Sequence, residues 1–192
     1  SAEGLILTVR PRGKEKPAST VRVDLAEGAE EGLGRGDVVA PPNRFSAVSL
    51  RLKAPESAPD RRELLAAERR SLRADTDGGT TVTLRLQAET ERPVRLSASG
   101  LNAVESRKVA LLNSSTGQSY DLRAQRAVTL QNVDSTGLQL AVGNAAFVET
   151  KRESIVPDEV TLTSYPNPFR TQATIEYTLP ETKDVRITVY DI

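Results

Sequence analysis

Two carboxylates in one short loop are the residues with the clearest chemical potential. Asp75 and Asp77 begin the run Asp-Thr-Asp-Gly-Gly. Many calcium loops start with D-x-D-G, because carboxylate oxygens are the ligands that Ca²⁺ prefers. An EF-hand also requires a glutamate at the twelfth position, which is Leu86 here, so that pattern fails. Two hypotheses remain: a hairpin turn led by Asp-Gly, which is favoured, and a calcium site that a distant carboxylate completes.

Several side chains that enzymes commonly use are missing. The sequence contains no histidine and no cysteine, which excludes Ser-His-Asp triads, cysteine nucleophiles and His- or thiolate-based metal sites. Carboxylate pairs and Ser-Lys chemistry remain. A glycosidase needs two carboxyl groups about 5–10 Å apart, whereas the acidic residues here are scattered over polar strand positions and turns. We therefore expect no catalytic activity and no cofactor.

Charge and aromatic content narrow the choice of partner. The formal net charge is zero, from 26 basic and 26 acidic residues, which argues against nucleic acid or an anionic membrane. No apolar run is long enough to predict a membrane span. Carbohydrate binding is disfavoured, because sugars usually stack on aromatic rings and Tyr120 is the only tyrosine or tryptophan before residue 150. A carbohydrate-binding or calcium-dependent adhesion module is kept as the alternative function.

Alternation of apolar and polar residues recurs along most of the chain. It predicts half-buried strands, and Gly-, Pro- and Asp-rich turns separate them. Many short strands of this kind are typical of two packed antiparallel sheets. We therefore predict an all-β fold, an antiparallel β-sandwich of Ig-like or jelly-roll-like type. The expected strands lie at 5–10, 21–25, 48–53, 82–88 and 94–99, with further short runs at 107–112, 118–123, 126–131 and 137–143.

Residues 60–73 do not follow this pattern. Their composition favours a helix, and Asp60 and Glu63 have the spacing of a capping box. The apolar face of such a helix would be thin, and a single helix would interrupt an otherwise continuous series of strands. Tertiary pairing often overrides propensity, so a strand over 62–70 is slightly favoured and the helix stays open as an alternative.

The C-terminal segment has the most specific pattern. Tyr165-Pro166-Asn167-Pro168-Phe169 is stiffened by two prolines, which fix φ and push the residues before them toward extended conformations. Alternation follows over 174–179, with Ile175 and Tyr177 on the apolar side, and resumes over 185–189 after a polar turn. The segment ends in Val-Tyr-Asp-Ile. Together these motifs resemble the start of the type A C-terminal sorting domain of the type IX secretion system, which exports proteins in Bacteroidetes-like bacteria.

The resemblance covers about residues 157–192 and implies the first strands of a second Ig-like sandwich. The implied sorting-motif residues are Tyr165, Pro166, Asn167, Pro168, Phe169, Ile175 and Tyr177. We expect three parts: a β-sandwich module over 1–150, a polar linker over 151–163, and an incomplete sorting domain over 164–192. The secretion machinery is the implied partner of the last part, and the implied location is outside the cell or on its outer surface.

Residues 79–148 carry a softer resemblance to a β-sandwich module that often precedes this sorting domain in large bacterial surface proteins. Its phrases include Pro-Val-Arg-Leu-Ser-Ala-Ser-Gly-Leu at 93–101 and the Val-Gly-x-x-x-Phe-Val-Glu ending at 142–149. The resemblance implies a structural or stalk role, with any activity residing in upstream domains of the native protein. Asp134-Ser135-Thr136 also resembles the O-glycosylation triplet of exported Bacteroidetes proteins, although Asp-Ser-Thr makes a good turn by itself.

A partial sandwich has unpaired sheet edges, which tend to pair with other strands. We therefore predict that 157–192 either packs on residues 1–150 or pairs with another chain as an edge-strand dimer. If the segment docks on the first module, Phe169, Ile175 and Tyr177 are the expected anchors.

Overall fold

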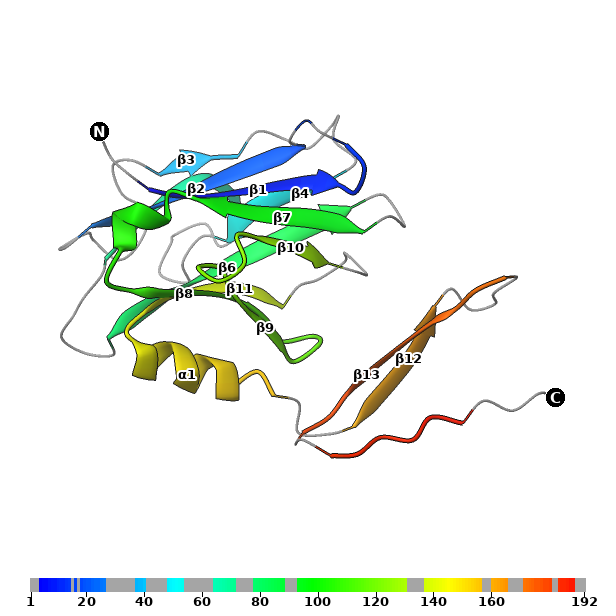
Figure 1. Cartoon of the computed structure of the whole chain (residues 1–192). Coiled ribbons are helices and arrows are strands. Elements are labelled where there is room, and N and C mark those ends of the chain that lie inside the picture. The colour runs from blue at the N-terminus through cyan, green and yellow to red at the C-terminus, as the bar shows by residue number, and fades with distance from the viewer. Residues whose placement is uncertain are drawn as a thin grey trace.

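The computed structural model shows a mostly β protein, with one short α-helix among the residues that it describes (Figure 1). It describes residues 4–14, 16, 18–26, 37–40, 48–53, 64–71, 78–88, 93–130, 137–156, 160–165, 171–180 and 183–188. The strands of the first module are β1 (Leu5–Pro11), β2 (Ser19–Ala26), β3 (Val38–Val39), β4 (Val48–Lys53), β5 (Leu64–Ser71), β6 (Gly79–Ala88), β7 (Val94–Ser99), β8 (Lys108–Asn113), β9 (Gln118–Asp121), β10 (Ala127–Leu130) and β11 (Leu138–Gly143). A 3₁₀ helix covers Leu101–Val104, α1 covers Ala145–Glu153, and β12 (Thr161–Tyr165) and β13 (Thr174–Thr178) follow.

The apolar–polar pattern of the sequence located most strands of the first 150 residues correctly, whereas β12 was not predicted. Every alternating segment predicted in the first 150 residues forms a strand, and β3 is an unpredicted addition of two residues. In β1 the apolar members of the alternation, Leu5, Leu7 and Val9, are buried, while the residues between them are partly exposed. The period-two pattern therefore reports which face of each strand is turned toward the core.

The strand hypothesis for the ambiguous segment is confirmed, and the helix hypothesis is wrong. β5 pairs with β2 in parallel on one side and with β4 in antiparallel fashion on the other. Leu65 is completely buried in the core. Hydrogen-bonded neighbours on both sides and a buried leucine outweigh the helical propensity of the surrounding Ala, Glu and Arg residues.

The expected pair of separate antiparallel sheets is not what forms. Eleven strands of the described residues belong to one mixed sheet with the order β10-β7-β1-β2-β5-β4-β6-β11-β8-β9, and β3 pairs with β5 beside this path. The sheet curls until its ends, β10 and β9, face each other, so that it is nearly a closed barrel (Figure 1). The two expected layers become one sheet because β5 pairs with both β2 and β4 and so joins them.

Both halves of the curled sheet contribute to a single core. Leu7 of β1 and Leu96 of β7 lie in one cluster with Leu84 of β6 and Leu111 of β8. Burial of a leucine side chain stabilises the folded state by roughly 1.5–3 kcal/mol, and this core contains mainly leucine and valine. The module therefore has an apolar interior of its own, without disulfides.

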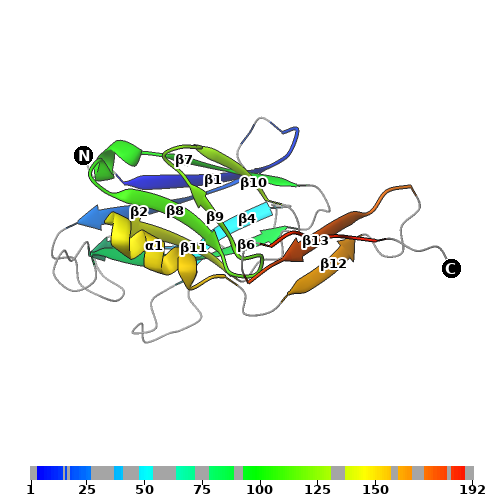
Figure 2. The same ribbon diagram turned by 60° about the horizontal axis from the view of Figure 1, so that its bottom comes forward.

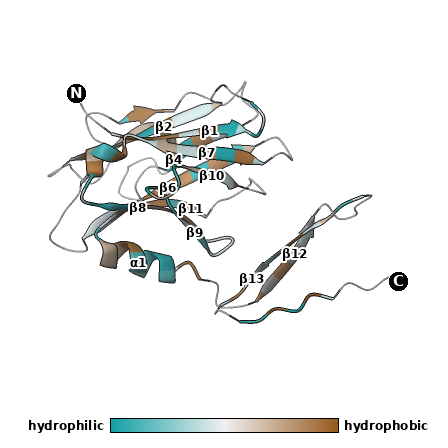
Figure 3. Cartoon of the chain, in the orientation of Figure 1, coloured by the Kyte–Doolittle hydropathy of each residue, from teal (hydrophilic) through white to brown (hydrophobic). Residues whose placement is uncertain are grey.

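The C-terminal segment forms a separate two-stranded sheet. β12 pairs with β13 in antiparallel fashion, with Leu162 opposite Tyr177 and Ser164 opposite Ile175. The prediction of a strand at 185–189 is wrong for its described part, since residues 183–188 form no strand. Val185 and Ile187 still alternate with polar residues (Figure 3), but alternation alone does not make a strand without a hydrogen-bonded neighbour. The interval predicted as a linker contains the end of α1 and the start of β12.

Candidate functional site

Most residues predicted to form a site lie outside the described residues. They are both candidate calcium ligands, the candidate glycosylation site and the centre of the sorting motif: Asp75, Asp77, Ser135, Pro166, Asn167, Pro168 and Phe169. Tyr165 ends β12, but its side chain is not among those described. Within the described ranges, no three His, Cys, Asp or Glu residues come together as a group that could hold a metal ion.

The two remaining sorting-motif residues lie on one face of the C-terminal hairpin. Ile175 and Tyr177 are both on β13, and directly opposite residues of paired strands point to the same side, so Leu162 shares this face. These side chains are largely open to solvent: 65% of Leu162, 44% of Tyr177 and 39% of Ile175 is exposed. Ile175 and Tyr177 are therefore not buried as anchors on the first module, and pairing with another chain stays a prediction.

Helix α1 connects this hairpin to the body. It lies on the outside of the sheet across β8 and β11 (Figure 2). Val148 and Ile155 are buried there in a second small cluster with Ala110, Leu112 and Ala141. β8 is thus covered on both faces, by the main core on one side and by α1 on the other. The helix fixes the point at which the C-terminal segment leaves the body.

The start of α1 packs against three glycines, Gly78, Gly79 and Gly143. The N–H of Asn144 donates to the carbonyl of Gly78 (2.7 Å), and the Asn144 side chain accepts a hydrogen bond from the N–H of Phe147 (2.8 Å), as an N-cap does. Gly79 and Gly143 are directly opposite each other on β6 and β11. A Cβ on either of them would collide with the ring of Phe147. The absence of a side chain on these two glycines therefore leaves the space in which the Phe147 ring packs.

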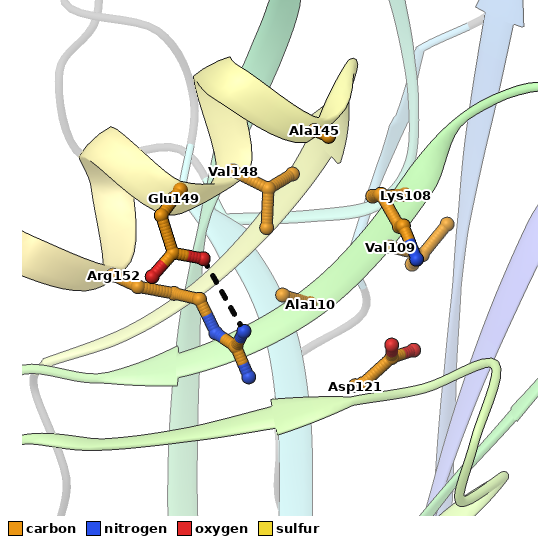
Figure 4. Close-up of a pocket in the computed structure, with 8 residues that line it drawn as sticks. All are labelled: Lys108, Val109, Ala110, Asp121, Ala145, Val148, Glu149 and Arg152. Atoms are coloured by element: carbon orange, nitrogen blue, oxygen red, sulfur yellow. Dashed lines mark ion pairs between the residues drawn. The ribbon is translucent and has the colours of Figure 1, made fainter.

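A small pocket lies between α1 and the sheet beneath it (Figure 4). Its volume is about 160 Å³, and α1, β8 and β9 line it. Arg152 donates from Nε to the hydroxyl of Ser119 (3.0 Å) and pairs with Glu149 at 3.5 Å. The carboxylate of Asp121 accepts the backbone N–H groups of Arg123 and Ala124. The polar groups of the pocket thus fasten the helix to β9 and order the turn after it.

Both carboxylates that line the pocket already have partners. Of the carboxylates that line the pocket, Asp121 is engaged by backbone donors and Glu149 by an arginine. A general acid or base needs a nucleophile or substrate position within hydrogen-bond reach, and the pocket residues of α1, β8 and β9 include no serine–lysine pair.

No helix in the described part of the chain has the length and hydrophobicity to cross a bilayer.

Comparisons with known proteins found no matching family model, no similar curated protein and no similar solved structure. The sorting-domain resemblance therefore depends on the sequence motifs of the C-terminal segment alone.

Helix α1 was not predicted from the sequence, although three signals for it were present. Asn144 is followed by two alanines, and Lys151 and Arg152 stand in the last turn, where cations suit the helix dipole. In addition, residues 109–112 read Val-Ala-Leu-Leu without alternation. A strand that is apolar on both faces must be covered on both faces. That run was the sign that another element lies on the outside of β8.

Proposed function

We propose that this chain is a non-catalytic structural module of a secreted or cell-surface bacterial protein, and that its C-terminal segment is the beginning of a type IX secretion sorting domain. The β body would act as a stalk or spacer next to further domains of the native protein. The C-terminal segment would bind the secretion machinery.

The observation that carries the proposal is the exposed apolar face of the β12–β13 hairpin. An isolated two-stranded hairpin is only marginally stable in water, and this one presents Leu162, Ile175 and Tyr177 to solvent. A face of this kind is typical of a surface that another protein covers. Ile175 and Tyr177 belong to the motif pattern that resembles the sorting domain, and Leu162 lies opposite Tyr177 on the same face, so the motif and the exposed apolar residues favour the same surface.

The finer description of the body as an Ig-like or jelly-roll-like sandwich belongs to this proposal. Its support is the single core shared by two facing halves of the sheet, with β5 as the bridge between them. A passive spacer needs stability rather than a cleft, and such a core supplies it.

The edge-strand dimer is the second part of the partner proposal. The outer edges of β12 and β13 have no strand neighbour among the described residues. Such edges readily pair with an equivalent edge of a second copy. Sedimentation velocity over a concentration series would measure this association, and a strict monomer at all concentrations would contradict the dimer while leaving the sorting proposal in place.

A chimeric reporter tests the sorting proposal. The first strands of an intact type A sorting domain, fused to a fluorescent protein, are replaced by residues 157–192 of this chain, and export is measured in a bacterium with a working type IX system. We expect export of the chimera and its loss with Tyr177→Asp on the apolar face. Thr174→Asp is the matched control, because Thr174 is exposed and lies on the opposite face. Retention of the unmodified chimera in the cells would overturn the proposal.

A further inference from the structure

A basic groove is formed by β1, β7 and β10 together with the turn that follows β1. It has a volume of about 610 Å³ and is open to solvent. Four cationic side chains line it, Arg10, Arg12, Lys14 and Arg95, together with the hydroxyl of Thr129. Among the described residues that line it there is no carboxylate. The zero net charge of the chain therefore hides a local concentration of positive charge.

The strand register places Arg10, Arg95 and Thr129 in one row. Arg10 of β1 is directly opposite Arg95 of β7, and Arg95 is directly opposite Thr129 of β10. In the next row, Thr8 is opposite Ser97, so hydroxyl groups continue the polar strip along the same outer face.

The turn that carries Arg12 and Lys14 is held by its backbone. The N–H of Arg12 donates to the carbonyl of Pro93 (2.8 Å), and the N–H of Lys14 donates to the carbonyl of Pro11 (3.1 Å). Gly13 has a φ of 85°, which a residue with a side chain rarely adopts. The groove is therefore formed before any ligand binds, which lowers the entropic cost of binding.

We propose that this groove binds an acidic polysaccharide. Guanidinium groups form paired hydrogen bonds with carboxylate or sulfate groups, and the neighbouring hydroxyls of Thr129, Thr8 and Ser97 suit the hydroxyls of a sugar ring. Recognition through charge does not need the aromatic stacking platform that neutral sugars use, so the scarcity of aromatic residues is no obstacle. The described lining has no aromatic side chain on which a nucleic-acid base would stack. The site does not depend on the sorting proposal.

Binding of the full chain to immobilised polysaccharides tests the proposal. The probes are polygalacturonate for carboxylates, dextran sulfate for sulfates, and neutral dextran as the blank, with vesicles of phosphatidylglycerol and phosphatidylcholine as a separate arm. We expect binding to one or both acidic polymers, a fall in affinity with rising salt, and no binding to neutral dextran. The polymer that binds more tightly identifies the charged group.

A matched pair of variants distinguishes binding in the groove from general attraction between the polymer and positive charge on the protein. Arg12→Gln/Lys14→Gln/Arg95→Gln removes three cations from the groove. The control, Arg51→Gln/Lys53→Gln/Arg85→Gln, removes three cations from β4 and β6, where Arg51 is also directly opposite Arg85. Charge-assisted hydrogen bonds are strong enough that we expect the groove variant to lose about tenfold or more in affinity, and the control less than about twofold.

Arg12, Lys14 and Arg95 are exposed, so the groove variant should keep the thermal unfolding temperature of the unmodified protein. Three results would overturn the proposal: no binding to either acidic polymer, an equal loss of affinity in the two triple variants, or binding to the vesicles in preference to the polysaccharides.

Discussion

Replacing Gly143 with alanine tests the packing of the Phe147 ring of α1 against Gly79 and Gly143. The added methyl carbon would lie 2.6 Å from Cδ1 of Phe147, 2.7 Å from the carbonyl oxygen of Gly78 and 2.8 Å from Cα of Gly79. Two of these three atoms belong to the backbone of a paired strand and its turn, so the ring is the group that can move. Overpacking of this kind costs about 1–3 kcal/mol. We expect Gly143→Ala to lower the free energy of unfolding by that amount and to loosen the helix.

Replacing Phe147 with alanine tests the same contact between the ring and Gly143 by removing the ring. Phe→Ala in a full core costs about 3–5 kcal/mol, and Phe147 is only half-buried, so about half of that loss is expected. If Gly143→Ala acts by displacing the ring, then its cost must shrink by about 1 kcal/mol when Phe147 is already alanine. Part of the cost should persist, because the clash with the backbone of Gly78 remains.

The assay combines urea unfolding followed by far-UV circular dichroism with hydrogen exchange of the α1 amides. Gly143→Ala should raise the exchange rates of residues 147–153 more than those of β1 and β7, which lie away from the helix. Gly13→Ala is a useful contrast, since a methyl group there meets no atom within 4 Å and acts only through its positive φ. Unchanged protection of α1, or equal costs of Gly143→Ala with and without the ring, would refute the reasoning.

Three further outcomes follow from the described contacts. Asn144→Ala removes the N-cap of α1 and should cost about 1 kcal/mol in urea unfolding, while Asn144→Asp, which keeps an acceptor oxygen, should cost much less; equal losses would contradict the capping role. Arg123 donates to three backbone carbonyls around the 3₁₀ helix, so Arg123→Ala should cost about 2 kcal/mol by the same measurement, and a loss below about 0.5 kcal/mol would mean that water replaces these bonds. Tyr177→Asp should weaken self-association in sedimentation relative to Thr174→Asp, and an equal effect of the two changes would show that the apolar face plays no part.

The strands were predictable from the sequence because burial has a local signature. The alternation of Leu5, Leu7 and Val9 with polar residues states that one face of the segment is buried, and this is true whichever strand lies beside it. The order of strands is not local. Nothing in residues 64–71 indicates that this segment pairs with β2 in parallel and closes two layers into one sheet.

The predictions were wrong at the helix, whose local signals were overlooked, and at the end of the C-terminal segment, where the local pattern was misleading. α1 has a weak apolar face: it packs on the sheet through Val148, with Ile155 just after it, and through the ring of Phe147 against the glycines of β6 and β11. The alternation at Val185 and Ile187 equals that of the true strands, but the described part of the chain offers this segment no pairing partner. Of the predicted site, Ile175 and Tyr177 are placed and exposed, whereas the ligands proposed for calcium lie outside the described residues.

We have proposed that the C-terminal segment serves as a delivery signal on a non-catalytic β body. The most direct test of this proposal is the amount of the chimeric reporter in the culture medium of a strain with a working type IX system, compared with an otherwise identical strain that lacks this system. We predict that residues 157–192 support release in the first strain and not in the second. Equal amounts outside both strains, or none outside either, would contradict the proposal.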